Sequence, residues 1–157
     1  MIAIIIKGRS FRGIVNYTLQ ATDNAGRERP EVTILSATVP GRTAEEFVQS
    51  FGVLRRKRPN LGVAVAHIVL SFRPDAPPVS DATATKVAET LMQRLRYDGF
   101  LLVRHSGHVH CIASRITFAG GVVSDAHDYR RAETIVRDLE HEFGIAPDRR
   151  SHLVGAR

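Results

Sequence analysis

The chain has 157 residues, of which 43% are hydrophobic and 24% charged, so it suits one globular domain with a hydrophobic core and is not a low-complexity polypeptide. Its single cysteine excludes an intramolecular disulfide framework and indicates a reducing compartment such as the cytoplasm. Lysine and arginine outnumber aspartate and glutamate by 22 to 16, and most of these cations are arginines. Because guanidinium groups bind phosphates with two parallel hydrogen bonds, this composition favours a polyanionic partner.

Hydrophobic periodicity and helix-capping residues predict alternating strands and helices. In chain order, the expected elements are a strand at 2–6 that is too short to span a membrane, a helix at 10–20 capped by Ser10, a turn-rich segment at 21–30, a strand within 31–39, a helix behind the capping box at 43–46, a strand at 63–72, a helix capped by Ser80, a hairpin of 99–105 and 108–116, and a helix from about Asp128 to Gly144. This order predicts one α/β or α+β sheet with helices packed on it. We expect a single domain at residues 1–145 and a basic tail at 146–157.

Three of the seven histidines lie within six residues, in the segment 104–112 (RHSGHVHCI). Alternate residues of a strand share one face, so His108 and His110 point to the same side. A two-residue turn at Ser106 and Gly107, in which Gly107 is free to adopt a positive φ, places His105 directly opposite His108 on that side. The three rings then converge, and Cys111 points to the other face.

Converging neutral imidazoles are typical of a metal site with open coordination positions. The alternative is that the histidines are ordinary polar residues on a half-exposed hairpin. We favour the metal site, because rings so close together repel one another when charged. A zinc finger is disfavoured, since the chain has one cysteine and it lies on the opposite face.

Tyr17 falls outside the apolar stripe of the first expected helix. That stripe includes Phe11, Val15 and Thr18, whereas Tyr17 lies beside it, one turn after Gly13. A tyrosine that packs in the core would lie on the apolar side, so a functional role is favoured. A glycine at position 13 would let a nucleic-acid backbone approach the helix closely.

Two parts of the chain resemble the MobA/VirD-type relaxases, the nicking enzymes of plasmid mobilisation. The first is residues 7–17 (KGRSFRGIVNY), which are similar to the segment that carries the nucleophilic tyrosine of that family. The second is His105 with the pair His108 and His110, followed by residues 113–116 and 124–131. The histidine pair is the signature of the wider class of HUH endonucleases.

The resemblance implies an α+β fold: a central antiparallel β-sheet with packed helices and the histidine strand in its centre. It implies a site- and strand-specific endonuclease and transesterase that nicks single-stranded DNA at a transfer origin during conjugative mobilisation. Tyr17 would be the nucleophile and form a 5′-phosphotyrosine intermediate. A divalent metal, Mg²⁺ or Mn²⁺, would be bound by His105, His108 and His110. Accessory mobilisation proteins are possible partners.

The residues expected to contact DNA are Arg9, Arg12, Gly13, His67, His127, Arg130 and Arg131. His67 lies in a strand with a His-x-x-x-Ser pattern that is common in the family, so it could contact DNA or buttress the metal ligands. A hydrogen-bonded histidine inside a central strand is the alternative. His127 could instead belong to a helix cap, together with Asp125 and Asp128.

The chain departs from the family between His105 and His108, where the spacer is only Ser106 and Gly107. The family usually has a longer, acidic spacer, whose aspartate orients a ligand histidine. Asp125 and Asp128 are the candidates to replace it here. The shortened spacer keeps open a second reading, a catalytically impaired DNA-binding protein that recognises an origin or hairpin and assists or regulates. A replication initiator is disfavoured because the tyrosine precedes the histidines. A general metallohydrolase would leave residues 7–17 unexplained.

Overall fold

The structure, a computed structural model, describes residues 1–20, 25–28 and 31–148. Its elements, in chain order, are β1 (Ile2–Gly8), α1 (Phe11–Leu19), β2 (Val32–Ala37), α2 (Ala44–Arg55), β3 (Val65–Ser71), α3 (Asp81–Arg94), β4 (Phe100–His105), β5 (His108–Ser114) and α4 (Asp128–Phe143). The strands form one sheet in the order β1-β3-β5-β4-β2, with every neighbouring pair antiparallel. The predicted α+β fold with a central histidine strand is therefore confirmed, and an α/β fold is excluded.

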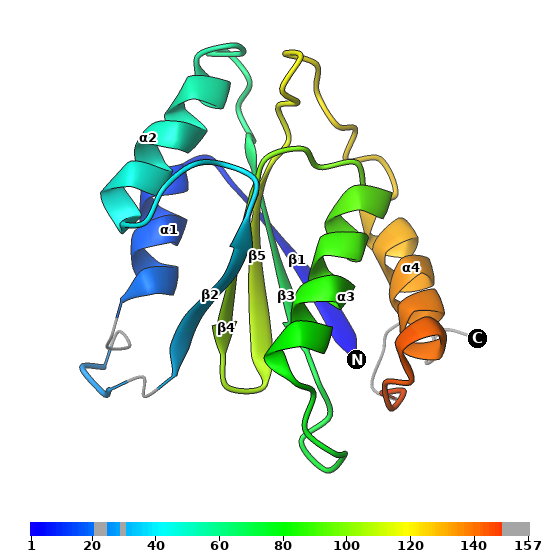
Figure 1. Ribbon diagram of the computed structural model, residues 1–157. Helices are drawn as coiled ribbons and strands as arrows, with labels where there is room; N and C mark the ends of the chain where they lie inside the picture. Colours follow the sequence, from blue (N-terminus) through cyan, green and yellow to red (C-terminus); the bar gives the residue numbers. More distant parts are fainter. Residues whose placement is uncertain (21–24, 29–30, 149–157) are drawn as a thin grey trace.

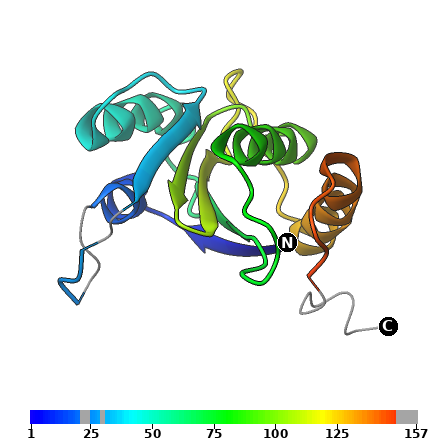
Figure 2. The ribbon, with the colours of Figure 1, turned by 60° about the horizontal axis from the view of Figure 1, so that its bottom comes forward.

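Helices cover both faces of this sheet (Figure 1). Figure 2 shows α1 and α2 on one side of the strands and α3 and α4 on the other. On the α3/α4 side, strand residues such as Leu102 and Cys111 pack in one core with Leu91 of α3 and Leu139 of α4. On the α1/α2 side, Ile112 packs in a second core with helical residues. A sheet with a core on each face explains why β3 and β5 are apolar at most positions.

Three helices begin where their capping residues predict. The side-chain oxygen of Ser10 accepts a hydrogen bond from the Gly13 amide, at 3.1 Å. Thr43 and Ser80 make the same contact at the starts of α2 and α3, each at 3.2 Å. The last helix ends, as expected, before Gly144, whose φ of 64° is left-handed. The capping contacts of Ser10, Thr43 and Ser80 therefore define where α1, α2 and α3 start.

The β4–β5 hairpin has the predicted register, with His105 directly opposite His108. The turn itself differs from the expectation. The left-handed residue is Ser106, with φ of 50°, and Gly107 does not have a positive φ. The expectation that Gly107 adopts a positive φ is therefore wrong. The two-residue length of the turn still sets the register as predicted.

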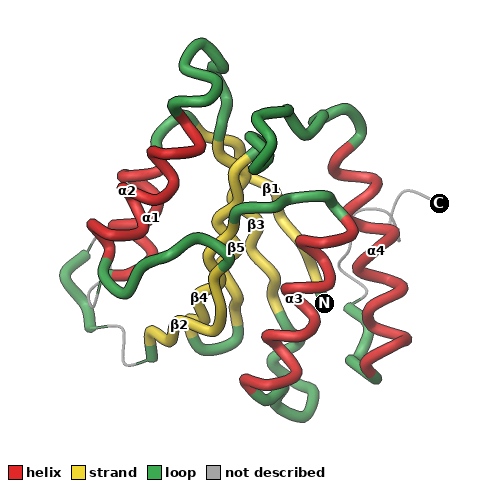
Figure 3. Tube along the Cα trace, turned by 45° about the horizontal axis from the view of Figure 1, so that its top comes forward, coloured by secondary structure: helices red, strands yellow, loops and turns green. Residues whose placement is uncertain are grey.

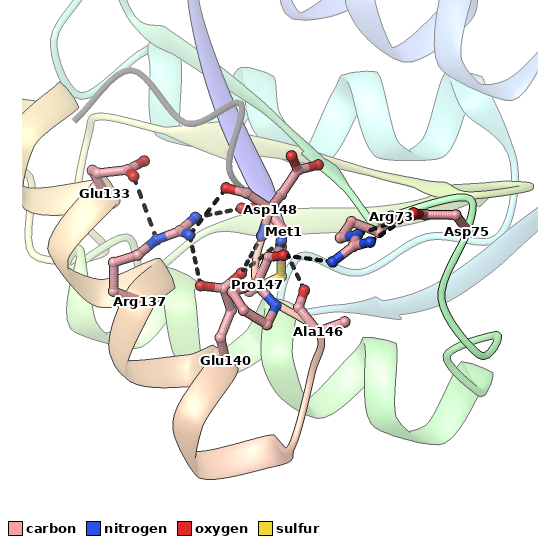
Figure 4. Close-up of polar contacts among 9 residues, drawn as sticks. All are labelled: Met1, Arg73, Asp75, Glu133, Arg137, Glu140, Ala146, Pro147 and Asp148. Atoms are coloured by element: carbon pink, nitrogen blue, oxygen red, sulfur yellow. Dashed lines mark hydrogen bonds and ion pairs between the residues drawn. The ribbon is translucent and has the colours of Figure 1, made fainter. Parts of the chain in front are cut away.

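The N-terminus is held by a buried ionic network (Figure 4). The Met1 ammonium group donates to Glu140 Oε2 at 2.6 Å, and Arg137 Nη1 lies 2.8 Å from Glu140 Oε1. The same carboxylate accepts a hydrogen bond from the Asp148 amide, and the Ala146 carbonyl lies 3.4 Å from the ammonium group. Residues 146–148, the start of the expected basic tail, therefore pack against α4 and Met1, the residue before β1. The rest of that tail, residues 149–157, lies outside the described residues.

Within the part of the chain that the structure describes, no helix has both the length and the apolar character needed to cross a membrane.

Candidate functional site

The histidines of β5 lie on the sheet face that α1 and α2 partly cover. His108 is opposite His105 on one side and Ser71 on the other, and His110 is opposite Val103 and Val69. Directly opposite residues of antiparallel strands share a face, so these side chains all point toward the α1/α2 side. The α1 and α2 layer is visible in Figure 3 beside β4 and β5.

Three imidazoles meet on this face, and one of them comes from β3. His67 Nε2 lies 2.9 Å from His110 Nδ1, and the two ring centroids are 5.2 Å apart. The ring centroids of His105 and His110 are 4.4 Å apart. We call His67, His105 and His110 the imidazole cluster.

Helix α1 contacts the imidazole cluster through its last turn. His105 Nε2 lies 2.6 Å from the carbonyl oxygen of Thr18, which is a fully buried residue of α1. The neighbouring residue is Tyr17, whose side chain is 36% exposed. The packing of α1 therefore brings the residue next to Tyr17 into direct contact with a histidine 87 positions later in the chain.

His108 is the first residue of β5, two positions before His110, and it lies at the exposed end of the hairpin. Its Nδ1 lies 2.8 Å from Ser71 Oγ, and no ring contact joins it to the imidazole cluster among the described contacts. The expectation that His105, His108 and His110 converge is met for His105 and His110. The third ring beside them is that of His67 and not that of His108. The register between β3 and β5 sets the His67 ring beside His110.

Burial keeps His67 neutral. Its side chain is 6% exposed, and removal from water, together with the nearby His105, lowers its pKa from 6.5 to about 4. A neutral imidazole keeps a lone pair on one ring nitrogen, which is the form that accepts hydrogen bonds or binds a metal.

The chemistry of these donors suits a transition-metal ion better than Mg²⁺, because imidazole is a softer ligand than carboxylate or water. Their arrangement is a weaker match. Among the described residues, no group of three or more histidine, cysteine, aspartate or glutamate side chains is disposed to hold a metal ion. His105 Nε2 points to the Thr18 carbonyl, and the facing nitrogens of His67 and His110 point to each other.

Asp125 and Asp128 do not replace the missing spacer aspartate. Both carboxylates lie near Lys7 Nζ, at 3.3 and 3.1 Å, and Asp125 also lies 3.6 Å from Arg115. Lys7 is opposite Ala66, whose side chain belongs to the core on the α3/α4 side. The expectation that one of these aspartates orients a ligand histidine is therefore wrong, because the ion pairs hold both on the other face.

The residues expected to contact DNA fall into two groups. Arg9, Arg12 and Gly13 are exposed at or near the start of α1, on the histidine side. Exposed residues His127, Arg130 and Arg131 lie at the start of α4, whose apolar side packs in the core of the opposite face. The second group is therefore not brought together with the histidines. Its role in DNA binding stays a prediction.

The histidine face is open along β1, which is an edge strand. Ile4 and Ile6, opposite Val69 and His67, are 45% and 51% exposed. At the hairpin end, the face continues into a cavity of about 1130 Å³ lined by residues that include Ile4, Ser71 and His108.

Comparison with known protein families gives a match that covers most of the chain. The family model described as "Relaxase: MobA/VirD2-like, nuclease domain" matches residues 17–145. This range begins at Tyr17 and includes every residue of the imidazole cluster, whereas the segment 7–16 precedes it. Comparisons with curated proteins and with solved structures gave no match. The chain belongs to the MobA/VirD2-like relaxase family, as a nuclease domain of the kind that nicks DNA.

Proposed function

We propose that this domain nicks single-stranded DNA at a transfer origin, in a site- and strand-specific reaction that serves conjugative mobilisation. The proposed nucleophile is Tyr17, and the imidazole cluster with His108 forms the site that binds the scissile phosphate. The observation that supports this assignment best is the 2.6 Å contact of His105 with Thr18, because it sets the helix that carries Tyr17 directly against the histidines.

The reaction would be a phosphoryl transfer. The Tyr17 oxygen forms a bond to the phosphorus as the bond from phosphorus to the 3′ oxygen breaks. The phenol proton is lost, and the leaving 3′ oxygen takes up a proton, so the products are a 5′-phosphotyrosine link and a free 3′-hydroxyl. Attack by that hydroxyl on the phosphotyrosine reverses each change and recloses the strand, so no outside energy source is needed.

A divalent metal, Mg²⁺ or Mn²⁺, is proposed as the cofactor, with His105, His108 and His110 as its ligands and His67 beside them. When bound, such an ion supplies positive charge that stabilises the phosphate oxygens in the transition state. The chain's own residues would orient the phosphate: the open β1 side receives the strand, and Arg9 and Arg12 supply cationic contacts near α1.

The test uses the purified chain, end-labelled single-stranded origin oligonucleotides, and Mg²⁺ or Mn²⁺, followed by denaturing electrophoresis. We expect a protein–DNA adduct that resists denaturation and needs the added ion. Tyr17→Phe removes only the attacking oxygen, so it should abolish the adduct while DNA binding persists on a native gel. His108→Ala/His110→Ala should also lose the adduct. An adduct formed by Tyr17→Phe would exclude Tyr17 as the nucleophile.

A catalytically impaired DNA-binding protein is the second candidate. It is favoured by the short Ser106–Gly107 spacer and by the lack, among the described side chains, of a group disposed to hold a metal ion. This reading predicts retention of origin or hairpin DNA on a native gel with no covalent adduct under any metal tested.

A further inference from the structure

Two hydrogen bonds, one between His67 and His110 and one from His105 to Thr18, constrain where the ring protons of the imidazole cluster lie. Histidines that bind metals keep a lone pair on one ring nitrogen and donate the other N–H to a neighbouring group, which fixes the ring orientation. In this family that neighbour is expected to be a carboxylate of the spacer, and the two aspartates considered as replacements are held on the opposite face.

We propose that His67 and the backbone carbonyl of Thr18 are the positioning groups of this site: His110 donates its Nδ1–H to Nε2 of His67, and His105 donates its Nε2–H to Thr18. The inference rests on the proposed function for the identity of the ligand histidines, but its geometry does not depend on a bound ion. A buried histidine of β3 would thus perform, with a neutral ring, the orienting role of an aspartate.

The direction of the bond from His105 follows from the chemistry of its partner. A backbone carbonyl only accepts hydrogen bonds, so at 2.6 Å His105 must carry a proton on Nε2. A neutral His105 then keeps its lone pair on Nδ1. Because Thr18 lies in the last turn of α1, the same bond ties the orientation of the ring to the position of the helix that carries Tyr17.

The direction of the bond between His67 and His110 follows from the proposed role of His110 as a ligand. His67 is 6% exposed and surrounded by strand residues, whereas His110 is half-buried. If His110 donates from Nδ1, its lone pair lies on Nε2. If His67 donated instead, a neutral His110 would carry its proton on Nε2, and neither of its nitrogens could act as a ligand. Only the first arrangement is compatible with the proposed role of His110.

The deciding experiment reads the tautomers directly in the metal-free protein. Two-bond ¹H–¹⁵N correlation spectra of the uniformly ¹⁵N-labelled chain separate protonated from unprotonated ring nitrogens for each histidine. We expect the Nδ1–H form for His110 and the Nε2–H form for His105. An Nε2–H form of His110 in the wild-type protein would overturn the proposal.

Two matched variants extend the test to metal binding. His67→Gln keeps an amide group near the position of Nε2 and can still accept from His110, whereas His67→Leu fills a similar volume with no polar atom. We expect His67→Leu to lose the defined His110 tautomer and to weaken Mn²⁺ binding in calorimetry by about 10–100-fold, with His67→Gln restoring most of both. Equal Mn²⁺ affinity for all three proteins would contradict a positioning role.

Thermal unfolding of the three proteins separates positioning from stability. His67→Gln supplies a second measure if His67→Leu does not fold. The outcome is also distinct from that of the nicking assay. Expected tautomers in a protein that forms no DNA adduct would leave this inference standing and refute the proposed function, whereas an adduct from a protein with the reverse tautomer would do the opposite.

Discussion

Arg12 of α1 and Glu45 of α2 form a two-point ion pair, with nitrogen–oxygen distances of 2.6 and 3.1 Å. Both side chains are more than half exposed, and the pair lowers the pKa of Glu45. A cation that is expected to contact DNA is thus bound to a carboxylate of the same chain. Glu45 would compete with a phosphate for the Arg12 guanidinium group.

Removing this competition should strengthen DNA binding. Glu45→Gln leaves Arg12 available to a phosphate, so affinity for single-stranded DNA should rise, and the plot of log K against log salt should steepen by about 0.7 for one added contact. Fluorescence anisotropy at several salt concentrations measures both quantities. Arg12→Ala is the control and should bind more weakly than either protein. An unchanged salt slope in Glu45→Gln would exclude Arg12 from the interface.

We expect the substitution Thr18→Val to stabilise the fold. The hydroxyl oxygen of Thr18 is buried and has no hydrogen-bond partner within the described structure, although the Thr18 carbonyl binds His105. Leaving a buried hydroxyl unsatisfied costs about 1–3 kcal/mol, and valine replaces it with a methyl group of similar shape. Thr18→Val should therefore raise the free energy of unfolding by about 1 kcal/mol. Urea titration checks this, and a loss of similar size would show that a buried water satisfies the hydroxyl.

In the hairpin turn, the serine and not the glycine has the backbone conformation that favours glycine. Ser106 has a left-handed φ of 50°, which costs a residue other than glycine roughly 1–2 kcal/mol. Ser106→Gly relieves that strain and adds flexibility to the unfolded chain, so we expect a net gain of about 0.5 kcal/mol.

Gly107→Ala is the matched control in the same turn. A Cβ atom at this position meets no atom within 4 Å, and the backbone φ is not left-handed. Alanine should therefore be tolerated or slightly stabilising. If thermal denaturation instead shows a marked loss for Gly107→Ala, the left-handed residue of the turn is the glycine.

Disrupting the buried ionic network around Glu140 should cause a large loss of stability. Glu140→Gln removes the negative charge that pairs with Arg137 and neutralises the Met1 ammonium group, so this fully buried cation is left without its carboxylate partner. Breaking a buried ion pair on one side costs about 3–5 kcal/mol. The exposed pair of Glu142 and Arg94 supplies the control, and Glu142→Gln should cost less than about 1 kcal/mol. Similar melting temperatures for the two variants would contradict this prediction.

Cys111 should not react in the folded protein. It is fully buried in the α3/α4 core, and burial raises the pKa of its thiol. Alkylation needs an accessible thiolate, so labelling with iodoacetamide should occur only as fast as the protein unfolds. Mass spectrometry of samples labelled with and without urea measures this, and rapid labelling of native protein at neutral pH would disprove it.

The sequence predicts much of the local structure because local contacts decide it. Ser10, Thr43 and Ser80 cap the helices that follow them, since each side chain reaches an amide only three residues away. The register of the histidine hairpin follows from the two residues between its strands, and the burial of Cys111 on the opposite face follows from the alternation of β5.

Only the tertiary structure decided which groups meet in the site. His67 joins His110 from 43 positions away because β3 pairs with β5 in one particular register. The same long-range packing set Asp125, Asp128, Arg130 and Arg131 on the α3/α4 side, although the sequence suggested that they lie near the histidines. A capping residue or a turn acts within a few positions, whereas strand register and the face that a helix covers depend on burying apolar surface from the whole chain. The sequence by itself therefore determined the elements and the nuclease family, and the packed sheet determined the partners of each histidine.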